Sequence, residues 1–167
     1  TLVTALDLAT QADFETASKQ VAPLIADGSP GARTAARFVQ AGAALELRDP
    51  AKAIALYRQI AEDAEAPGPL RDLARLREVA TGYDTMASKD VIAKLRPLAE
   101  PGKPYFASAG ELVAMAELEL GNTAEAGRLF AAIAKDEKAR YTLRSRARQM
   151  AGLLGVDAIV DVKKLLE

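Results

Sequence analysis

Few side chains in this sequence could support catalysis, because its 167 residues include neither histidine nor cysteine. The chain therefore lacks the commonest general base, the commonest metal ligand and any thiolate nucleophile. Two serines, Ser88 and Ser108, are the nucleophile candidates that we considered. Ser108 does not stand in the Gly-x-Ser-x-Gly motif of a nucleophile elbow, and Ser88, although followed by Lys89, has the position of a helix N-cap. These residues predict no nucleophilic site.

Carboxylates are the remaining groups that could hold a metal ion or act as acid and base. They gather at the end of one expected helix and along another: Glu62, Asp63 and Glu65, and Glu111, Glu117 and Glu119. We interpret both groups as helix ends and solvated helix faces. The sequence also contains no Gly-rich phosphate loop and no dinucleotide-binding fingerprint. We therefore expect a protein that is not an enzyme and that has no metal site and no cofactor.

Alanine and leucine dominate the composition, with 36 and 21 residues, whereas 5% of the residues are aromatic. Alanine has the highest helix propensity, and its small side chain lets neighbouring helices approach closely. Half of the residues are hydrophobic, which is enough to build a core. The net charge of −1 provides no general attraction to nucleic acid or to anionic lipid. The composition predicts an all-α protein that does not bind nucleic acid.

Helix breakers recur along the chain and divide it into segments of helical length. Ser29 and Asp49 each precede a proline, which is typical of an N-cap followed by proline at the first helical position. Asn122, with Glu125 three residues later, resembles a capping box. We expect a single domain, 1–167, with leading helices in 1–27, helix pairs at about 31–65, 69–100 and 104–137, and capping helices in 139–167.

A small–aromatic–small pattern, with a spacing of four residues, recurs in the second helix of the expected pairs. Two strong and two weaker copies are Ala53, Tyr57 and Ala61; Ala126, Phe130 and Ala134; Val91, Leu95 and Ala99; and Ala17, Val21 and Ile25. In chain order the copies begin at Ala17, Ala53, Val91 and Ala126, so that their starts are separated by 36, 38 and 35 residues. Tetratricopeptide repeats have a period of about 34 residues. The sequence thus predicts a tetratricopeptide-like array, a right-handed α-solenoid of about three to four helix pairs with a capping helix.

Two groups of charged residues are candidate partner-binding surfaces. In tetratricopeptide arrays the first helix of a repeat lines a peptide-binding groove, and in the middle pair this helix carries Arg71, Arg75 and Glu78. From position 139 onward, six basic residues outnumber three acidic ones. Three of the basic residues share one helical face at a spacing of four: Arg140, Arg144 and Arg148. Ordinary surface charge, or the polar outer face of a capping helix, would also explain these groups.

Three segments of the chain resemble one known family. They are 69–77, the run from Ser108 to Asp136, and 143–150. They are similar to the tetratricopeptide-like domain of the bacterial ancillary subunits of the SecYEG translocon, in its alphaproteobacterial form. The similarity extends from about Ala32 to Gly155. The resemblance implies a periplasmic domain at the inner membrane that associates with translocon subunits, periplasmic chaperones and exported chains. It transfers no individual binding residue.

The family has an N-terminal membrane helix, and we expect such an anchor upstream of Thr1. The resemblance thus implies a protein–protein interaction scaffold that an anchor would hold at the periplasmic face of the bacterial inner membrane. Two alternatives remain open. A soluble cytoplasmic tetratricopeptide adaptor would begin shortly before Thr1 without an apolar segment, and a regulatory subunit would assemble with copies of itself through exposed helix faces.

Overall fold

The structure, a computed structural model, describes residues 1–156, in which all regular elements are helices and no strand occurs. The α-helices are α1 (Leu2–Thr10), α2 (Phe14–Asp27), α3 (Pro30–Glu46), α4 (Pro50–Glu62), α5 (Gly68–Gly82), α6 (Ser88–Leu95), α7 (Phe106–Glu119), α8 (Thr123–Lys135) and α9 (Tyr141–Leu153). Two short 3₁₀ helices, η1 (Tyr83–Thr85) and η2 (Arg96–Leu98), follow α5 and α6. The prediction of an all-α fold is confirmed.

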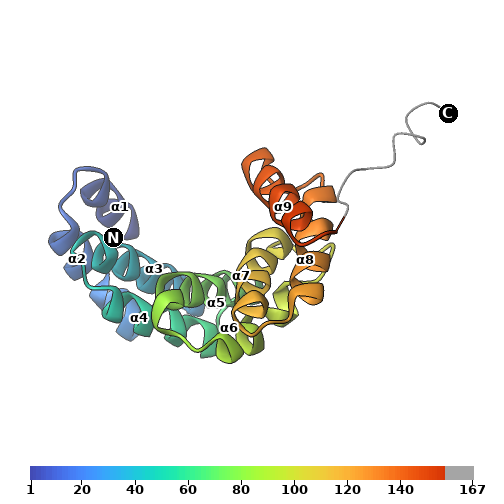
Figure 1. The fold of residues 1–167 in the computed structure, drawn as a ribbon. Coiled ribbons are helices and arrows are strands. Elements are labelled where there is room, and N and C mark those ends of the chain that lie inside the picture. The colour runs from blue at the N-terminus through green and yellow to red at the C-terminus, as the bar shows by residue number, and fades with distance from the viewer. Residues whose placement is uncertain (157–167) are drawn as a thin grey trace. The chain divides into compact units, whose positions relative to one another are not determined.

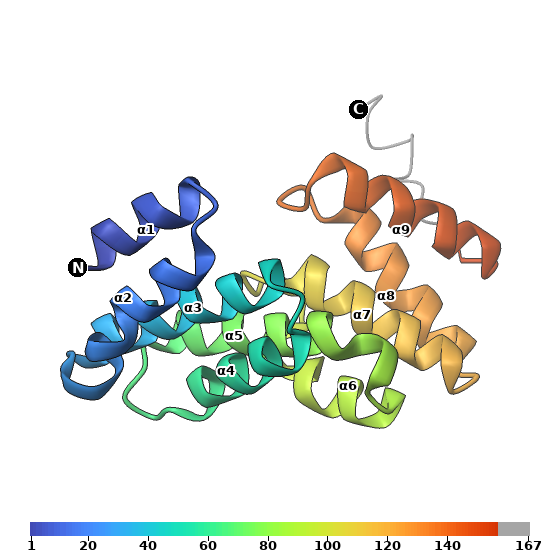
Figure 2. The same cartoon turned by 90° about the vertical axis from the view of Figure 1, so that its left-hand side faces the viewer.

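The contacts between residues divide the chain into two compact units. Unit 1 comprises residues 1–85 and contains α1 to α5, whereas unit 2 begins at Met86 and contains α6 to α9. Within each unit every helix packs against the next one in the sequence (Figure 1). In unit 1, α1 also contacts α3, and in unit 2, α7 also contacts α9 (Figure 2). This packing of consecutive helices is compatible with a helical repeat.

The predicted N-caps at Ser29 and Asp49 are confirmed. The hydroxyl of Ser29 accepts a hydrogen bond from the backbone N–H of Ala32 at 3.4 Å, and the Asp49 carboxylate accepts one from Lys52 at 3.0 Å. Each cap precedes a proline at the first helical position, where the missing N–H removes no helical bond. Asp13 caps α2 in the same manner. Local side-chain chemistry therefore fixes the start of three successive helices.

Two further capping predictions are wrong. Asn122 occupies the N-cap position of α8 but makes no capping bond, because its side-chain amide instead donates to the Glu117 carboxylate at 2.7 Å. Ser88 is the first residue of α6, with Ala87 at the N-cap position, and its hydroxyl bonds to the carboxylate of Glu119. In both places the side chain that the local pattern assigned to a cap donates a hydrogen bond to a carboxylate of α7 instead.

The same turn joins the two helices of a pair at three places in the chain. Ala12, Arg48 and Gly121 each have a positive φ, of 62°, 60° and 80° respectively. In each turn the next backbone N–H donates to the carbonyl five residues earlier, at distances of 2.8 to 3.0 Å. One residue in the left-handed conformation thus satisfies the last carbonyls of the helix.

The spacing of these turns follows the repeat seen in the sequence. The first and second are 36 residues apart, and the second and third are 73 apart, which is about twice the repeat period. Gly155, with a φ of 73°, ends α9 with the same bond, from the backbone N–H of Val156 to the carbonyl of Ala151 at 2.9 Å. At the place where a further copy is due, the 3₁₀ helix η1 follows α5 instead. The backbone therefore carries an internal repeat, with one irregular member.

The residues of the small–aromatic–small pattern form much of the core. Eleven of the twelve are buried, and the twelfth, Ile25, is partly buried. In unit 1, Tyr57 lies against Phe38 of α3, with ring centroids 5.9 Å apart. In unit 2, Phe130 packs in a cluster with Phe106 and Ile133. Within the described part of the chain, no helix combines the length and the apolar character that crossing a membrane requires.

Candidate functional site

The three residues predicted to line a groove lie on α5 but do not form one exposed surface. Glu78 is buried, with 1% of its side chain exposed, and its carboxylate accepts a hydrogen bond from Arg58 Nε of α4 at 2.9 Å. Arg75 is partly exposed and pairs with Asp72 on its own helix at 3.3 Å. Arg71 is partly exposed, and its Nε is buried without a hydrogen bond. Glu78 therefore belongs to the interior of unit 1 and cannot contact a partner.

The predicted basic face lies on α9 and at its start. Arg140 is the N-cap residue and is exposed, Arg148 is exposed, and Arg144 is partly exposed. None of the three makes an ion pair within residues 1–156. The neighbouring Arg146, which the pattern did not single out, pairs with Glu111 of α7 at 3.0 Å. The other charged residues of the predicted basic excess, from position 157 onward, lie outside the described residues.

Arg140 also lines a pocket of unit 2, with a volume of about 350 Å³. The pocket lies between two short segments, 102–104 before α7 and 136–140 before α9. Three of its lining residues are basic: Lys103, Lys138 and Arg140. Asp136 is the acidic residue among those that line it. This concave surface combines cations from segments that are 35 residues apart in the sequence.

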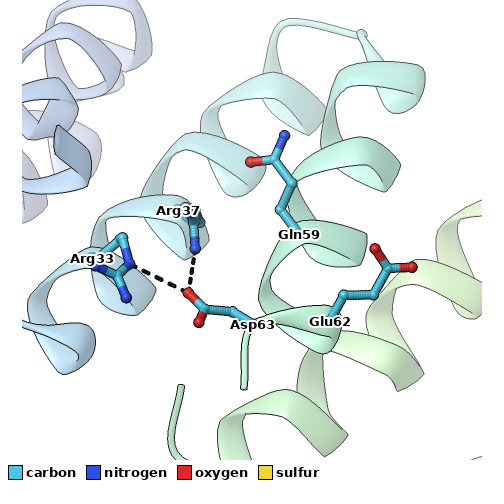
Figure 3. A pocket seen from close by; sticks show the side chains of 5 residues that line it. All are labelled: Arg33, Arg37, Gln59, Glu62 and Asp63. Carbon is cyan, nitrogen blue, oxygen red and sulfur yellow. Dashed lines mark hydrogen bonds and ion pairs between the residues drawn. The ribbon is translucent and has the colours of Figure 1, made fainter. Parts of the chain in front are cut away.

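A second pocket, of about 510 Å³, belongs to unit 1 (Figure 3). Arg33 and Arg37 of α3 point toward Asp63, which follows α4, and Gln59 and Glu62 of α4 also line the pocket. Arg37 Nη1 lies 2.8 Å and Arg33 Nε 3.3 Å from the same oxygen of Asp63. The two guanidinium groups thus converge on one carboxylate.

The charges of Arg33, Arg37 and Asp63 in this second pocket are paired within the chain. Burial of Asp63 opposes its ionisation, but the hydrogen bond from Arg37, the backbone N–H of Glu65 and the charge of Arg33 outweigh burial and lower the pKa of Asp63 below its ordinary value. Arg33 also pairs with Glu65 at 2.6 Å, and these partners raise the pKa of Arg33. We interpret this cluster as a clamp between α3 and the end of α4.

Two of the carboxylates interpreted as solvated are in fact buried or largely buried. Only 15% of the Asp63 side chain is exposed, and only 5% of that of Glu117. Glu117 is held by the guanidinium of Arg96 and by the amide of Asn122. Glu62 and Glu65 are exposed, as expected. Within residues 1–156, no three carboxylates lie close enough together to hold a metal ion.

Comparisons of the chain with family models, with curated proteins and with solved structures find no match. The described residues define the class of the protein as all-α, with consecutive helices packed against each other inside two units. Two concave surfaces of the described residues carry several charges: the neutral arginine–carboxylate clamp of unit 1 and the basic pocket of unit 2.

Proposed function

We propose that this chain is a non-catalytic scaffold, a tetratricopeptide-like array that binds other proteins. The observation that carries the proposal is the internal repeat. A helix-ending turn recurs at Ala12, Arg48 and Gly121, in step with the buried small–aromatic–small positions. Repeat proteins stack supersecondary units in this way, and the extended surfaces that result serve as binding sites for partners.

The distribution of charge supports the same proposal. The largest clusters of ionised groups are ion pairs that join neighbouring helices, such as Arg58 with Glu78 and Arg33 with Asp63. Pairs of this kind hold neighbouring helices together. Lys103, Lys138 and Arg140, which make no ion pair within residues 1–156, lie on the surface of unit 2, where another protein can reach them.

We further propose that the scaffold works at the periplasmic face of the bacterial inner membrane, with translocon subunits, periplasmic chaperones or exported chains as its partners. This step rests on the resemblance of 69–77, 108–136 and 143–150 to the ancillary translocon subunits. The absence of cysteine is in keeping with an oxidising compartment.

The experiment that tests the proposal is co-purification of the tagged native protein from crosslinked cells, with mass spectrometry of the proteins that accompany it. We expect translocon subunits and periplasmic chaperones in the membrane fraction. An unrelated tagged periplasmic domain on a membrane anchor is the control for non-specific capture. Recovery from the soluble fraction with cytosolic partners would replace the membrane scaffold by the adaptor. Recovery of this protein alone, crosslinked to itself, would replace it by the self-assembling subunit.

A further inference from the structure

Acidic and basic residues are unequally distributed between the two units. Residues 1–85 contain twelve acidic and nine basic residues, a net charge of −3, whereas residues 86–156 contain eleven basic and eight acidic residues, a net charge of +3. In unit 2, three arginines are neutralised by carboxylates: Arg96, Arg128 and Arg146. Lys103, Lys138 and Arg140 make no ion pair within residues 1–156. The unneutralised charge of unit 2 therefore includes the three cations around one pocket.

The acidic residue of this pocket does little to neutralise them. One carboxylate oxygen of Asp136 accepts a hydrogen bond from the backbone N–H of Lys138 at 3.0 Å, so the carboxylate is turned into its own loop. With three cations and one carboxylate, the lining keeps a net charge of +2. All three cationic side chains are exposed, and their ammonium and guanidinium groups are free to meet an anion from solvent.

The pocket also has an apolar part. Ala107 of α7 and Leu143 of α9 line it and are both partly buried, and Pro104 adds a third apolar surface. Its volume of about 350 Å³ lies at the lower end of the range of about 300–1,000 Å³ for ligand pockets, which suits a segment of two or three residues. No aromatic side chain is among the described residues that line it, so a nucleic-acid base would find no stacking surface.

We propose that this pocket binds a short acidic peptide segment. One apolar side chain of the segment lies against Ala107 and Leu143, and carboxylates on either side of it pair with Lys103, Lys138 and Arg140. Complementary charge sets the orientation of the bound segment and accelerates its association. The inference rests on the proposed function, because it specifies the chemistry of the partner that the scaffold binds.

Fluorescence anisotropy with the whole chain tests this inference. The probe is a labelled peptide with a central leucine flanked on each side by two glutamates, and the same peptide with glutamines is the control ligand. We expect the glutamate peptide to bind the native chain. The Lys138→Glu/Arg140→Glu variant should bind this peptide more weakly, with a Kd that is higher by about tenfold or more. The matched control is Lys89→Glu/Arg77→Glu, which makes the same charge change at exposed positions outside the pocket. It should change Kd by at most about twofold.

Exchanging the charges of the pocket and of the peptide provides a second test of the same inference. The Lys138→Glu/Arg140→Glu variant should gain binding to the same peptide with lysines in place of glutamates. If this variant loses its helical circular dichroism signal, Lys138→Gln/Arg140→Gln takes its place, with weaker binding of the glutamate peptide as the expected result. The inference would be overturned if the pocket variant and the matched control lost the same amount of affinity for the glutamate peptide. It would also be overturned if the native chain bound the glutamine peptide as tightly as the glutamate peptide. Displacement of the peptide by phosphatidylserine vesicles or oligothymidylate at lower concentration than by unlabelled peptide would also overturn it.

The outcome is separable from that of the proposed function. If the pocket variant still captures the same partners in crosslinked cells and the glutamate peptide does not bind, the acidic-peptide site is wrong and the scaffold stands. If the native chain captures no partner at all, the scaffold itself is wrong, whatever the peptide does.

Discussion

Glu78 of α5 is buried, with 1% of its side chain exposed, and accepts a hydrogen bond at 2.9 Å from Arg58 of α4. The same relationship recurs in unit 2, where Arg96 contacts the buried Glu117 of α7. Each arginine directly follows the central residue of its small–aromatic–small copy, and the two pairs span 20 and 21 residues. The ion pair therefore recurs with the repeat: in unit 1 it joins α4 to α5, and in unit 2 it joins η2, directly after α6, to α7.

The first prediction concerns this ion pair. Arg58→Met should lower the free energy of unfolding by about 1.5–3 kcal/mol, because it removes a charged hydrogen-bond donor of a buried carboxylate. Arg58→Met combined with Glu78→Leu should be more stable than Arg58→Met alone, since an apolar pair leaves no buried charge to solvate. Urea denaturation followed by circular dichroism measures both. If the double variant is no more stable than Arg58→Met, the loss of stability in Arg58→Met does not come from the buried charge of Glu78.

The second prediction concerns the recurring turn. Arg48 has a φ of 60°, a conformation that costs a residue with a Cβ atom roughly 1–2 kcal/mol and costs glycine little. Arg48→Gly should therefore stabilise the chain by about 1 kcal/mol, and Gly121→Ala, at the equivalent position, should destabilise it by a similar amount. Arg48→Ala is the control, because it removes the side chain and keeps the backbone cost. Thermal denaturation checks the signs, and equal effects of Arg48→Gly and Arg48→Ala would assign the effect to the side chain.

The helices were predictable because their signals are local. Ser29 and Asp49 cap their helices with their own side chains, and the pattern around Tyr57 and Phe130 marks the buried faces through spacing alone. The capping predictions for Ser88 and Asn122 failed for a reason that lies outside the capping pattern itself. Carboxylates of α7, which lie 31 residues after Ser88 and five before Asn122, compete for those side chains. The capping pattern, which covers the N-cap residue and the three residues after it, contains no information about such competitors.

The candidate sites were predictable only in part, for the same reason. The spacing along α9 pointed to Arg140. Lys103 lines the same pocket because the fold brings the loop before α7 close to the loop before α9. Burial of Glu78, Glu117 and Asp63 was not foreseen, because a charged residue on an amphipathic helix normally faces solvent. The signal that could have revealed the first two is the arginine placed next to the central residue of two repeat copies.

The third prediction concerns the central aromatic residues of the two units. Tyr57→Ala and Phe130→Ala should each lower the free energy of unfolding by about 3–5 kcal/mol, the usual loss for truncating a buried aromatic ring. Of the two side chains, Tyr57 is 5% and Phe130 1% exposed. Tyr141→Ala is the matched control, because that ring is 74% exposed and its truncation should change stability by about 0.5 kcal/mol or less. Melting temperatures of all three variants test the assignment, and a shift of only one or two degrees for Phe130→Ala, about that of an exposed site, would contradict it.

The fourth prediction concerns the response of unit 1 to acid. The folded chain lowers the pKa of Asp63 below its ordinary value of 3.8. A group with a lowered pKa stabilises the fold fully above the pKa of the unfolded chain, and this contribution disappears as the pH falls through the folded pKa. The contribution of Asp63 should therefore be complete at neutral pH and should be lost progressively below a pH of 3.8.

Asp63→Asn isolates this contribution. At pH 7 the variant should be less stable than the native chain by about 1.5–3 kcal/mol, because the neutral amide replaces an ionised acceptor of two arginines. The difference should shrink as the pH falls below 3.8, where the native carboxylate takes up its proton. Glu62→Gln, at an exposed neighbouring position that makes no ion pair within residues 1–156, should leave stability nearly unchanged over the same range. Urea denaturation at a series of pH values decides the matter: a difference that stays constant from neutral to acid pH would mean that Asp63 acts through its shape and not through its charge.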